Sequence, residues 1–210
     1  MNIKNLLFSL VVLIIVVFAI RSNILLFAAD KGVNEIVKAM LAIGANINSK
    51  NMSYETPVVI ACARGNKKLV KYLLEKGADI NARGGGTEAS WTLLMAAAKE
   101  NNADDVKYFL EKGAEVNDRN AKGASAIMMT ENLEIAKMLL DKGANVNFSA
   151  ENGMTALMLI KNVEIIKLLI KKGANVNAKN LQAMSVLALA LKNKEYEKAT
   201  ILERNGALKQ

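Results

Sequence analysis

The chain of 210 residues has no histidine, one cysteine and one proline. Without histidine, Ser-His and Cys-His catalysis, histidine-ligated metals and a histidine pH switch are excluded. A single cysteine, Cys62, excludes an intramolecular disulfide. Aromatic residues make up only 5% of the chain, whereas hydrophobic residues reach 52%. This composition is typical of a helical chain rich in alanine and leucine, and it argues against a β-sandwich or barrel.

A short unit recurs almost to the end of the chain: Gly-Ala, two further residues and Asn, directly after an apolar helix face. Its glycines are separated by 33, 36, 30, 30 and 33 residues and stand at Gly44, Gly77, Gly113, Gly143, Gly173 and Gly206. The last copy is incomplete. A period near 33 residues predicts a stacked repeat array, a class that binds partners more often than it catalyses reactions.

The net charge is +8, from 28 basic and 20 acidic residues. Several lysines stand directly before a repeat glycine, where a cation complements the dipole at the C-terminus of a helix: Lys76, Lys112, Lys142 and Lys172. We therefore attribute the basic excess to solvated helix ends, with an acidic partner or an anionic lipid surface as the alternative. No stripe interleaves basic and aromatic residues, so we expect no nucleic-acid binding.

The second unit shows how one repeat is built. Thr56-Pro57 predicts a helix start, because threonine can cap free amides and proline is tolerated at the first helical position. A short apolar helix over 58–63 and a second helix over about 67–76 follow, and Gly77 supplies the left-handed residue that ends the second. We interpret the repeated Asn as structural, bonded to its own turn, rather than as a ladder of ligand sites.

These residues resemble the ankyrin repeat family over residues 23–210. The family pattern of Thr-Pro-Leu-His, small residues, Gly, Glu-Ile-Val, Leu-Leu, Gly-Ala and Asn is matched in order. The resemblance implies an all-α ankyrin-repeat solenoid of helix-turn-helix pairs, with hairpin-like fingers and a concave binding face. The repeats would span 23–48, 49–81, 82–117, 118–147, 148–177 and 178–210. The sequence departs from the family at the histidine that links neighbouring repeats, replaced by Val59, Met95, Met128, Met158 and Ala188.

The unequal spacing can be assigned to particular elements. The step of 36 residues includes Gly84-Gly85-Gly86, which predicts a longer and flexible third finger. From the cap position to the repeat glycine there are 21 residues in most repeats, but 18 from Ser125 and from Thr155. We therefore predict shortened first helices and a local change of curvature in the fourth and fifth repeats. The charged segment 194–203 predicts a second helix that faces solvent and caps the array.

Residues 1–22 are predicted to form a signal peptide or an N-terminal membrane anchor that precedes the array as an apolar helix. The run Leu6–Ile20 has Ser9 as its one polar residue. Its length fits a signal peptide, with a cleavage point after Ala19. The alternative is an uncleaved anchor counted from Ile3, with membrane contact through residues 6–20. Both interpretations place the repeats outside the cytoplasm, in the periplasm, at the cell surface or secreted.

We expect a non-catalytic protein-protein interaction module, without cofactor or metal, acting as an envelope scaffold or inhibitor. The alternatives are a secreted effector-like factor that binds proteins of another cell, and an enzyme with an unrecognised site. Trp91 is a candidate hot spot, unless it lies over its neighbouring finger. Cys62 should be a buried small residue, and the array should be monomeric. The predicted partner-binding residues are Met52, Glu55, Glu88, Trp91, Lys122, Met154, Gln182 and Met184.

Overall fold

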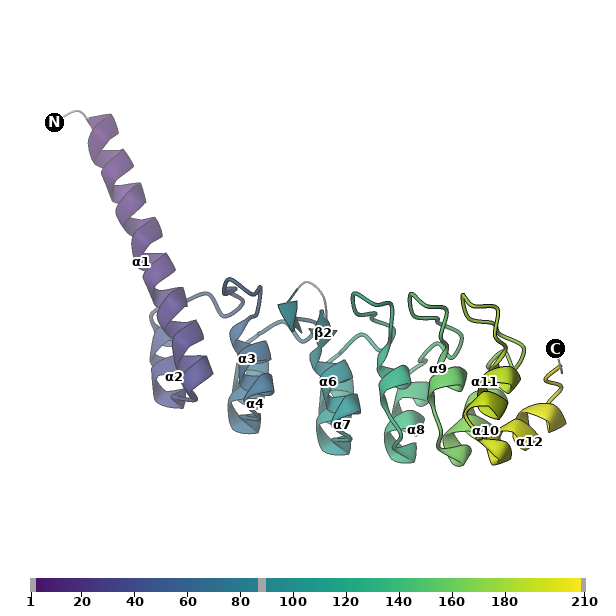
Figure 1. The fold of residues 1–210 in the computed structure, drawn as a ribbon. Helices are drawn as coiled ribbons and strands as arrows, with labels where there is room; N and C mark the ends of the chain where they lie inside the picture. Colours follow the sequence, from purple (N-terminus) through teal and green to yellow (C-terminus); the bar gives the residue numbers. More distant parts are fainter. Residues whose placement is uncertain (1–2, 87–89, 209–210) are drawn as a thin grey trace. The chain divides into compact units, whose positions relative to one another are not determined.

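The computed structural model describes residues 3–86 and 90–208, with the backbone alone for residues 3–10 and 14. The chain forms two compact units, residues 1–90 and 91–210. Each unit is built from paired helices whose connecting loops project as fingers (Figure 1). The predicted all-α solenoid class is therefore confirmed, with very short strands in addition.

The first unit contains α1 (Ile3–Lys31), α2 (Asn34–Ala42), α3 (Pro57–Ala63), α4 (Lys67–Glu75) and β1 (Arg83–Gly84). Helix α1 packs against α2 and α3 through its C-terminal part, and its N-terminal part stands clear of both (Figure 1). It runs without a break through residues 22 and 23, where the sequence suggested that one segment ends and the array begins. No Gly or Pro occurs in α1, and the left-handed residue that ends it is Gly32, with φ +68°.

The second unit contains β2 (Trp91–Thr92), α6 (Leu93–Lys99), α7 (Ala103–Glu111), the 3₁₀ helix η1 (Ala126–Met129), α8 (Leu133–Asp141), α9 (Ala156–Leu159), α10 (Val163–Lys171), α11 (Val186–Lys192) and α12 (Tyr196–Arg204). Its core is formed by apolar faces of successive helices, with Phe109, Leu139 and Leu169 almost completely buried. Neighbouring repeats therefore share one continuous core.

The second helices are uniform. Each of α2, α4, α7, α8, α10 and α12 is 9 residues long. The C-cap position of the middle ones is a lysine, as the sequence predicted: Lys76, Lys112, Lys142 and Lys172. The glycine that follows has a positive φ in every case, for example +90° at Gly77. Residues with a Cβ rarely adopt this conformation.

The first helices differ in length as predicted. Helices α3, α6 and α11 have 7 residues, whereas η1 and α9 have 4. Full-length repeats turn from the first helix to the second through a left-handed residue, Gly65, Asn101 or Lys194. The short repeats lack this turn and pass through extended backbone, with ψ 140° at Thr130 and 136° at Ile160. The predicted change of curvature stays a prediction.

The repeated Asn has a structural role, but its partner differs from the prediction. Asn117 Oδ1 accepts a hydrogen bond from Asn145 N at 2.7 Å, and Asn117 Nδ2 donates to Gly143 O at 3.0 Å. Both partners belong to the next repeat. The bond within the turn is made by the residue two places before the repeated Asn, as when Asn145 Oδ1 accepts from Asn147 N. The same bridge to the next repeat is made by Asn48, Asn147 and Asn177.

The predicted helix caps are present in some repeats only. Thr92 Oγ1 accepts from Met95 N at 3.2 Å, and Ser185 Oγ accepts from Ala188 N at 3.1 Å. The prediction of a cap at Thr56 is wrong, because this hydroxyl makes no capping bond. The same holds for Ser125 and Thr155, which precede the single-turn helices η1 and α9.

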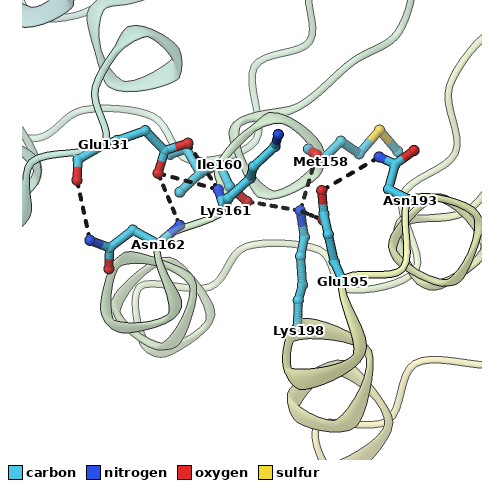
Figure 2. Close-up of polar contacts among 8 residues, drawn as sticks. All are labelled: Glu131, Met158, Ile160, Lys161, Asn162, Asn193, Glu195 and Lys198. Atoms are coloured by element: carbon cyan, nitrogen blue, oxygen red, sulfur yellow. Dashed lines mark hydrogen bonds and ion pairs between the residues drawn. The ribbon is translucent and has the colours of Figure 1, made fainter.

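The last repeat also corrects the sequence interpretation. Lys198 does not face solvent, since only 3% of it is exposed. Its ammonium donates to Ile160 O at 2.8 Å and Met158 O at 3.1 Å, and it lies 3.0 Å from Glu195 Oε2 (Figure 2). Met158 lies in the shortened helix α9 and Ile160 directly follows it, so Lys198 supplies hydrogen bonds that a longer helix would have made itself.

Glu131 binds free backbone amides of the same connection, as Lys198 binds its free carbonyls. The Glu131 carboxylate accepts from Lys161 N and from Asn162 N, each at 2.9 Å (Figure 2). Asn162 Nδ2 returns a bond to Glu131 O at 3.2 Å. The connection that replaces the missing turn in the fifth repeat is thus held by side chains of the repeats on both sides of it.

Candidate protein-binding surface

Three of the fingers are held in shape by an Asn at the base of the loop that binds two amides within the loop. Asn120 Oδ1 accepts from Lys122 N at 3.0 Å and from Ala124 N at 2.9 Å. Asn120 N donates to Ala124 O at 2.9 Å. The same arrangement occurs at Asn51 and Asn180. The side chains between these anchor points are therefore presented in a fixed position.

In the second unit, hydrogen bonds join neighbouring fingers into a ridge, which we define as residues 118–124, 148–154 and 178–184. Glu151 N donates to Lys122 O at 2.9 Å, and Leu181 N donates to Asn152 O at 3.1 Å. The Arg119 guanidinium binds Ser149 O and lies 5.2 Å from the centroid of the Phe148 ring. The finger ridge is a continuous surface rather than a set of independent loops.

The ridge carries four of the predicted partner-binding residues. Lys122 and Gln182 are exposed at its surface, whereas Met154 and Met184 are half-buried. Met154 Sδ accepts from Asn180 Nδ2 at 3.8 Å, so this methionine links two fingers as well as lining the surface. The result is a surface of mixed basic, polar and thioether groups.

Trp91 is half-buried at the start of the second unit. Its ring lies beneath the ammonium of Lys99, which is 4.8 Å from the ring centroid and belongs to the same repeat. Such a cation–π contact stabilises by about 0.5–1 kcal/mol at an exposed site. Part of the indole is therefore already occupied.

Three of the predicted partner-binding residues belong to the first unit. Met52 is fully exposed, at 100%. Glu55 is half-buried, and its Oε2 accepts from Asn51 Nδ2 at 3.0 Å. Glu88 lies outside the described residues. Met52 is thus free to contact a partner, whereas Glu55 also holds its own loop.

Sequence reasoning missed two exposed apolar side chains on the fingers. Leu181 is 73% exposed at the tip of its finger, and Tyr54 is 65% exposed with φ +62°. Both could have been identified from the sequence, because each is a large apolar residue inside an otherwise polar turn. Exposed groups of this kind on a rigid loop are suited to contact a partner.

The first helices and the finger of the first unit enclose a hollow of about 330 Å³. Across it, Arg64 Nε donates to Asp30 Oδ1 at 3.0 Å. The hollow combines this ion pair with an apolar wall, and its lining is Leu26, Phe27, Asp30, Asn51, Glu55, Ile60, Ala63 and Arg64. It forms part of the face that the sequence predicted to bind a partner. A second hollow, of about 440 Å³, lies beside the same finger and includes Tyr54 and Arg83.

In the parts of the chain that the structure describes, no three His, Cys, Asp or Glu side chains cluster in a way that could hold a metal. Cys62 is half-buried rather than fully buried as expected. The hydrogen bond to Glu35 raises the pKa of Lys38, and that to Glu164 raises the pKa of Lys167. Both pairs lie on helix surfaces, away from the two hollows.

Comparisons with known proteins agree with this architecture. The family model for ankyrin repeats (3 copies) matches residues 25–120 and 124–209. A crystal structure of an ankyrin repeat domain from Acinetobacter baumannii AYE superposes with a TM-score of 0.76 and 24% identity, covering 88% of this chain and 98% of that one. No curated protein sequence matches. Since the family model accounts for most of its length, the chain belongs to the ankyrin repeat family.

Proposed function

We propose that this protein is a membrane-tethered module that binds a protein partner outside the cytoplasm, as an envelope scaffold or inhibitor. Ankyrin repeats are protein–protein interaction modules, and this chain is built from them. The observation that carries the tether is α1, which continues unbroken from the apolar N-terminal segment into the first repeat.

The part of α1 that precedes the first repeat is suited to lipid. Residues Val11–Lys31 are long and apolar enough to cross a membrane. Large apolar side chains stand exposed along it, among them Val11, Leu13, Ile15, Phe18 and Ile20. The helix from Ile3 to Ile20 spans about 27 Å at 1.5 Å per residue, close to the roughly 30 Å hydrocarbon core. In water, this apolar surface would favour aggregation.

The retained anchor is favoured over a cleaved signal peptide. The Ala19–Ile20 peptide bond lies inside α1, whereas proteolysis concentrates at exposed loops. Two residues after that bond, Arg21 Nη1 donates to Ile43 O at 2.7 Å and ties α1 to the end of α2. The membrane segment therefore leads directly into the repeats, so the first repeat would sit at the membrane surface and its partner would be an envelope protein.

Fractionation and mass measurement test the tether. We expect the full-length chain in the membrane fraction, resistant to high salt and released by detergent. A reporter that is active only after export should be active when fused behind residues 1–30. Soluble protein in the medium that begins at Ile20 would support the secreted alternative and contradict the tether, and a reporter active only in the cytoplasm would contradict export.

Affinity capture from detergent-solubilised membranes tests binding by the finger ridge. Leu181→Ser removes an apolar group that is 73% exposed on the ridge, and Tyr196→Ser removes one that is 65% exposed on α12. Losing a well-packed apolar contact weakens binding by about tenfold or more. We expect that loss with Leu181→Ser and wild-type recovery with Tyr196→Ser. Equal recovery from both variants would remove the ridge from the proposal.

A further inference from the structure

The side of the first repeat that faces away from the second repeat is apolar. It carries large side chains that are 40–63% exposed, and we call this surface the repeat-1 face: Ile20, Ile24 and Phe27 on α1, with Ile36 and Ile43 on α2. Phe27 stands at the edge of this face, because it also lines the hollow formed with α3. The end of a repeat array normally needs a polar outer surface to stay soluble. The last repeat meets this need, since α12 exposes Glu197, Thr200 and Glu203.

The position of Ile36 shows that this face is built for stacking. Ile36 stands eight residues before its repeat glycine. Three of the four inner repeats have an apolar residue that is 0–1% exposed at that place, Leu69, Ile135 and Ile165, whereas the third repeat has the half-buried Asp105. At the same place in the last repeat, Lys198 binds carbonyls of the preceding repeat. This place therefore faces the preceding repeat, and in the first repeat it is left 43% exposed.

Ile43 leads to the same conclusion. It stands directly before Gly44, where later repeats have the C-cap lysine. Lys172, the lysine at that place in a later repeat, reaches back to Asp141 of the preceding repeat at 3.5 Å. The first repeat thus has an apolar residue where a charge would have met a neighbouring repeat.

The repeat-1 face continues along α1 as a stripe. Leu13, Ile20, Ile24 and Phe27 are separated by 7, 4 and 3 residues, which places them on one side of the helix. Leu25 and Ala29, on the other side, are completely buried within the repeat. The bond from Arg21 to Ile43 O holds the α1 and α2 parts of the face together.

We infer that the occupant of this face is a second copy of the same chain, in a symmetric dimer with parallel α1 helices. This inference rests on the proposed tether, because two copies in one bilayer enter it in the same direction. Identical faces can then meet around a two-fold axis that runs along α1. Lipid covers the stripe only as far as about Ile20, so Ile24, Phe27, Ile36 and Ile43 remain for the partner copy.

The size and character of the face fit this partner. The six half-exposed side chains of the repeat-1 face and the stripe offer on the order of 100 Å² each, or about 600 Å² together, against roughly 800 Å² per partner in a specific interface of standard size. A head-to-tail contact would place this apolar face against the charged residues of α12, and the two surfaces are not complementary. The sequence predicted a monomeric array, and the trapping and sedimentation experiments decide between the two states.

Disulfide trapping in membranes tests the dimer. With Cys62→Ser as background, Ile24→Cys places a thiol on the proposed axis, and Lys38→Cys places one on α2 away from the face. Mild oxidation should link most Ile24→Cys chains into dimers and at least tenfold fewer Lys38→Cys chains. Ile24→Lys should give a monomer by sedimentation in detergent, whereas Ile24→Leu should stay dimeric.

Each result separates the dimer from the tether. Full-length chains that stay in the membrane but are monomeric and unlinked at Ile24→Cys would overturn the dimer and leave the tether intact. Linkage of Ile24→Cys to a different protein would also overturn it. Chains that are absent from the membrane would contradict the tether, and the sedimentation of Ile24→Lys and Ile24→Leu would then decide the dimer separately.

Discussion

Lys198 lies where two inner repeats have isoleucine, Ile135 and Ile165. Its aliphatic stem can fill part of the same space, and its ammonium reaches the free carbonyls of Met158 and Ile160. Glu195 balances the charge at 3.0 Å. A cationic side chain is thus buried in the core because the shortened α9 leaves acceptors that an aliphatic residue cannot satisfy.

Replacing this lysine should destabilise the last repeat. Lys198→Ile restores the residue of the inner repeats, but it leaves Glu195 without its cation and two carbonyls without donors. Breaking a buried, hydrogen-bonded ion pair destabilises by about 3–5 kcal/mol, and we expect about 3 kcal/mol here. Amide hydrogen exchange in α11 and α12 would measure the loss locally, since unfolding of a repeat array need not be two-state.

Lys192→Ile serves as the control for Lys198→Ile, because Lys192 is exposed at the end of α11. It should change exchange in these helices by less than about 0.5 kcal/mol. If Lys198→Ile exchanges as slowly as the unmodified chain, the lysine is not what satisfies these carbonyls.

At the scale of elements, the fingers of the second unit depend on close backbone approach. Gly153 has φ +76°, and a Cβ there would lie 2.8 Å from Leu181 N and 2.9 Å from Asn180 Cα. Gly173 has a similar φ of +87° but nothing within 4 Å of its Cβ position. The two glycines share backbone strain and differ in whether another finger is adjacent.

Alanine at these two glycines should therefore have unequal effects. Gly173→Ala introduces only left-handed strain, about 1–2 kcal/mol. Gly153→Ala adds a clash that pushes its finger away from the next one and should break the bond from Leu181 N to Asn152 O. We expect faster exchange of the Leu181 amide in Gly153→Ala but not in Gly173→Ala. The same exchange rate at Leu181 in both variants would contradict coupling between these fingers.

The sequence predicted those elements that depend on local counting. Residue counts from Ser125 and Thr155 identified both shortened helices, and the place of each lysine before a glycine identified a helix end. Lys198 could not be interpreted in this way, because its carbonyl partners lie 38 and 40 residues away. A charged residue in a charged helix is normally predicted to be exposed to solvent. Lys198 is buried instead, because the missing turn in the preceding repeat leaves carbonyls that need a donor.

The candidate site was predicted less completely, for a related reason. Met52 and Lys122 were found because apolar and basic residues in a finger are visible in the sequence. Whether the Trp91 ring is free to contact a partner depends on Lys99, the last residue of α6, whose ammonium packs on the ring. The repeated Asn was assigned to its own turn because side-chain bonds to a neighbouring repeat leave no local pattern.

At the scale of the whole molecule, the chain is asymmetric along its length. Its first repeat continues an apolar helix and exposes an apolar face, and its last repeat exposes charged and polar residues on α12. A soluble array would need polar surfaces at both ends. This difference makes sense if the N-terminal end is covered and the fingers remain open to a partner.

The continuity of α1 allows the tether and the dimer to be separated by insertion. Each added helical residue rotates what precedes it by about 100°. Two alanines between Ser22 and Asn23 would turn the membrane segment by about 200°, so Leu13 and Ile20 would no longer align with Ile24 and Phe27. Seven residues of similar helix propensity rotate it by about 700°, within roughly 20° of two full turns, and restore the stripe.

Both insertions keep the apolar segment, and both displace Arg21 from Ile43 O. They therefore differ mainly in whether the membrane part of the stripe is aligned with the repeat-1 face. In a Phe27→Cys, Cys62→Ser background, we expect both chains in the membrane fraction. Oxidation should then give disulfide-linked dimers with the seven-residue insertion and several-fold fewer with the two-residue insertion. Equal linkage in the two chains would mean that the repeat-1 face pairs without the membrane part of the stripe. In that case, pairing would be confined to the part of the face beyond Arg21, and the membrane part of α1 would act as a tether alone.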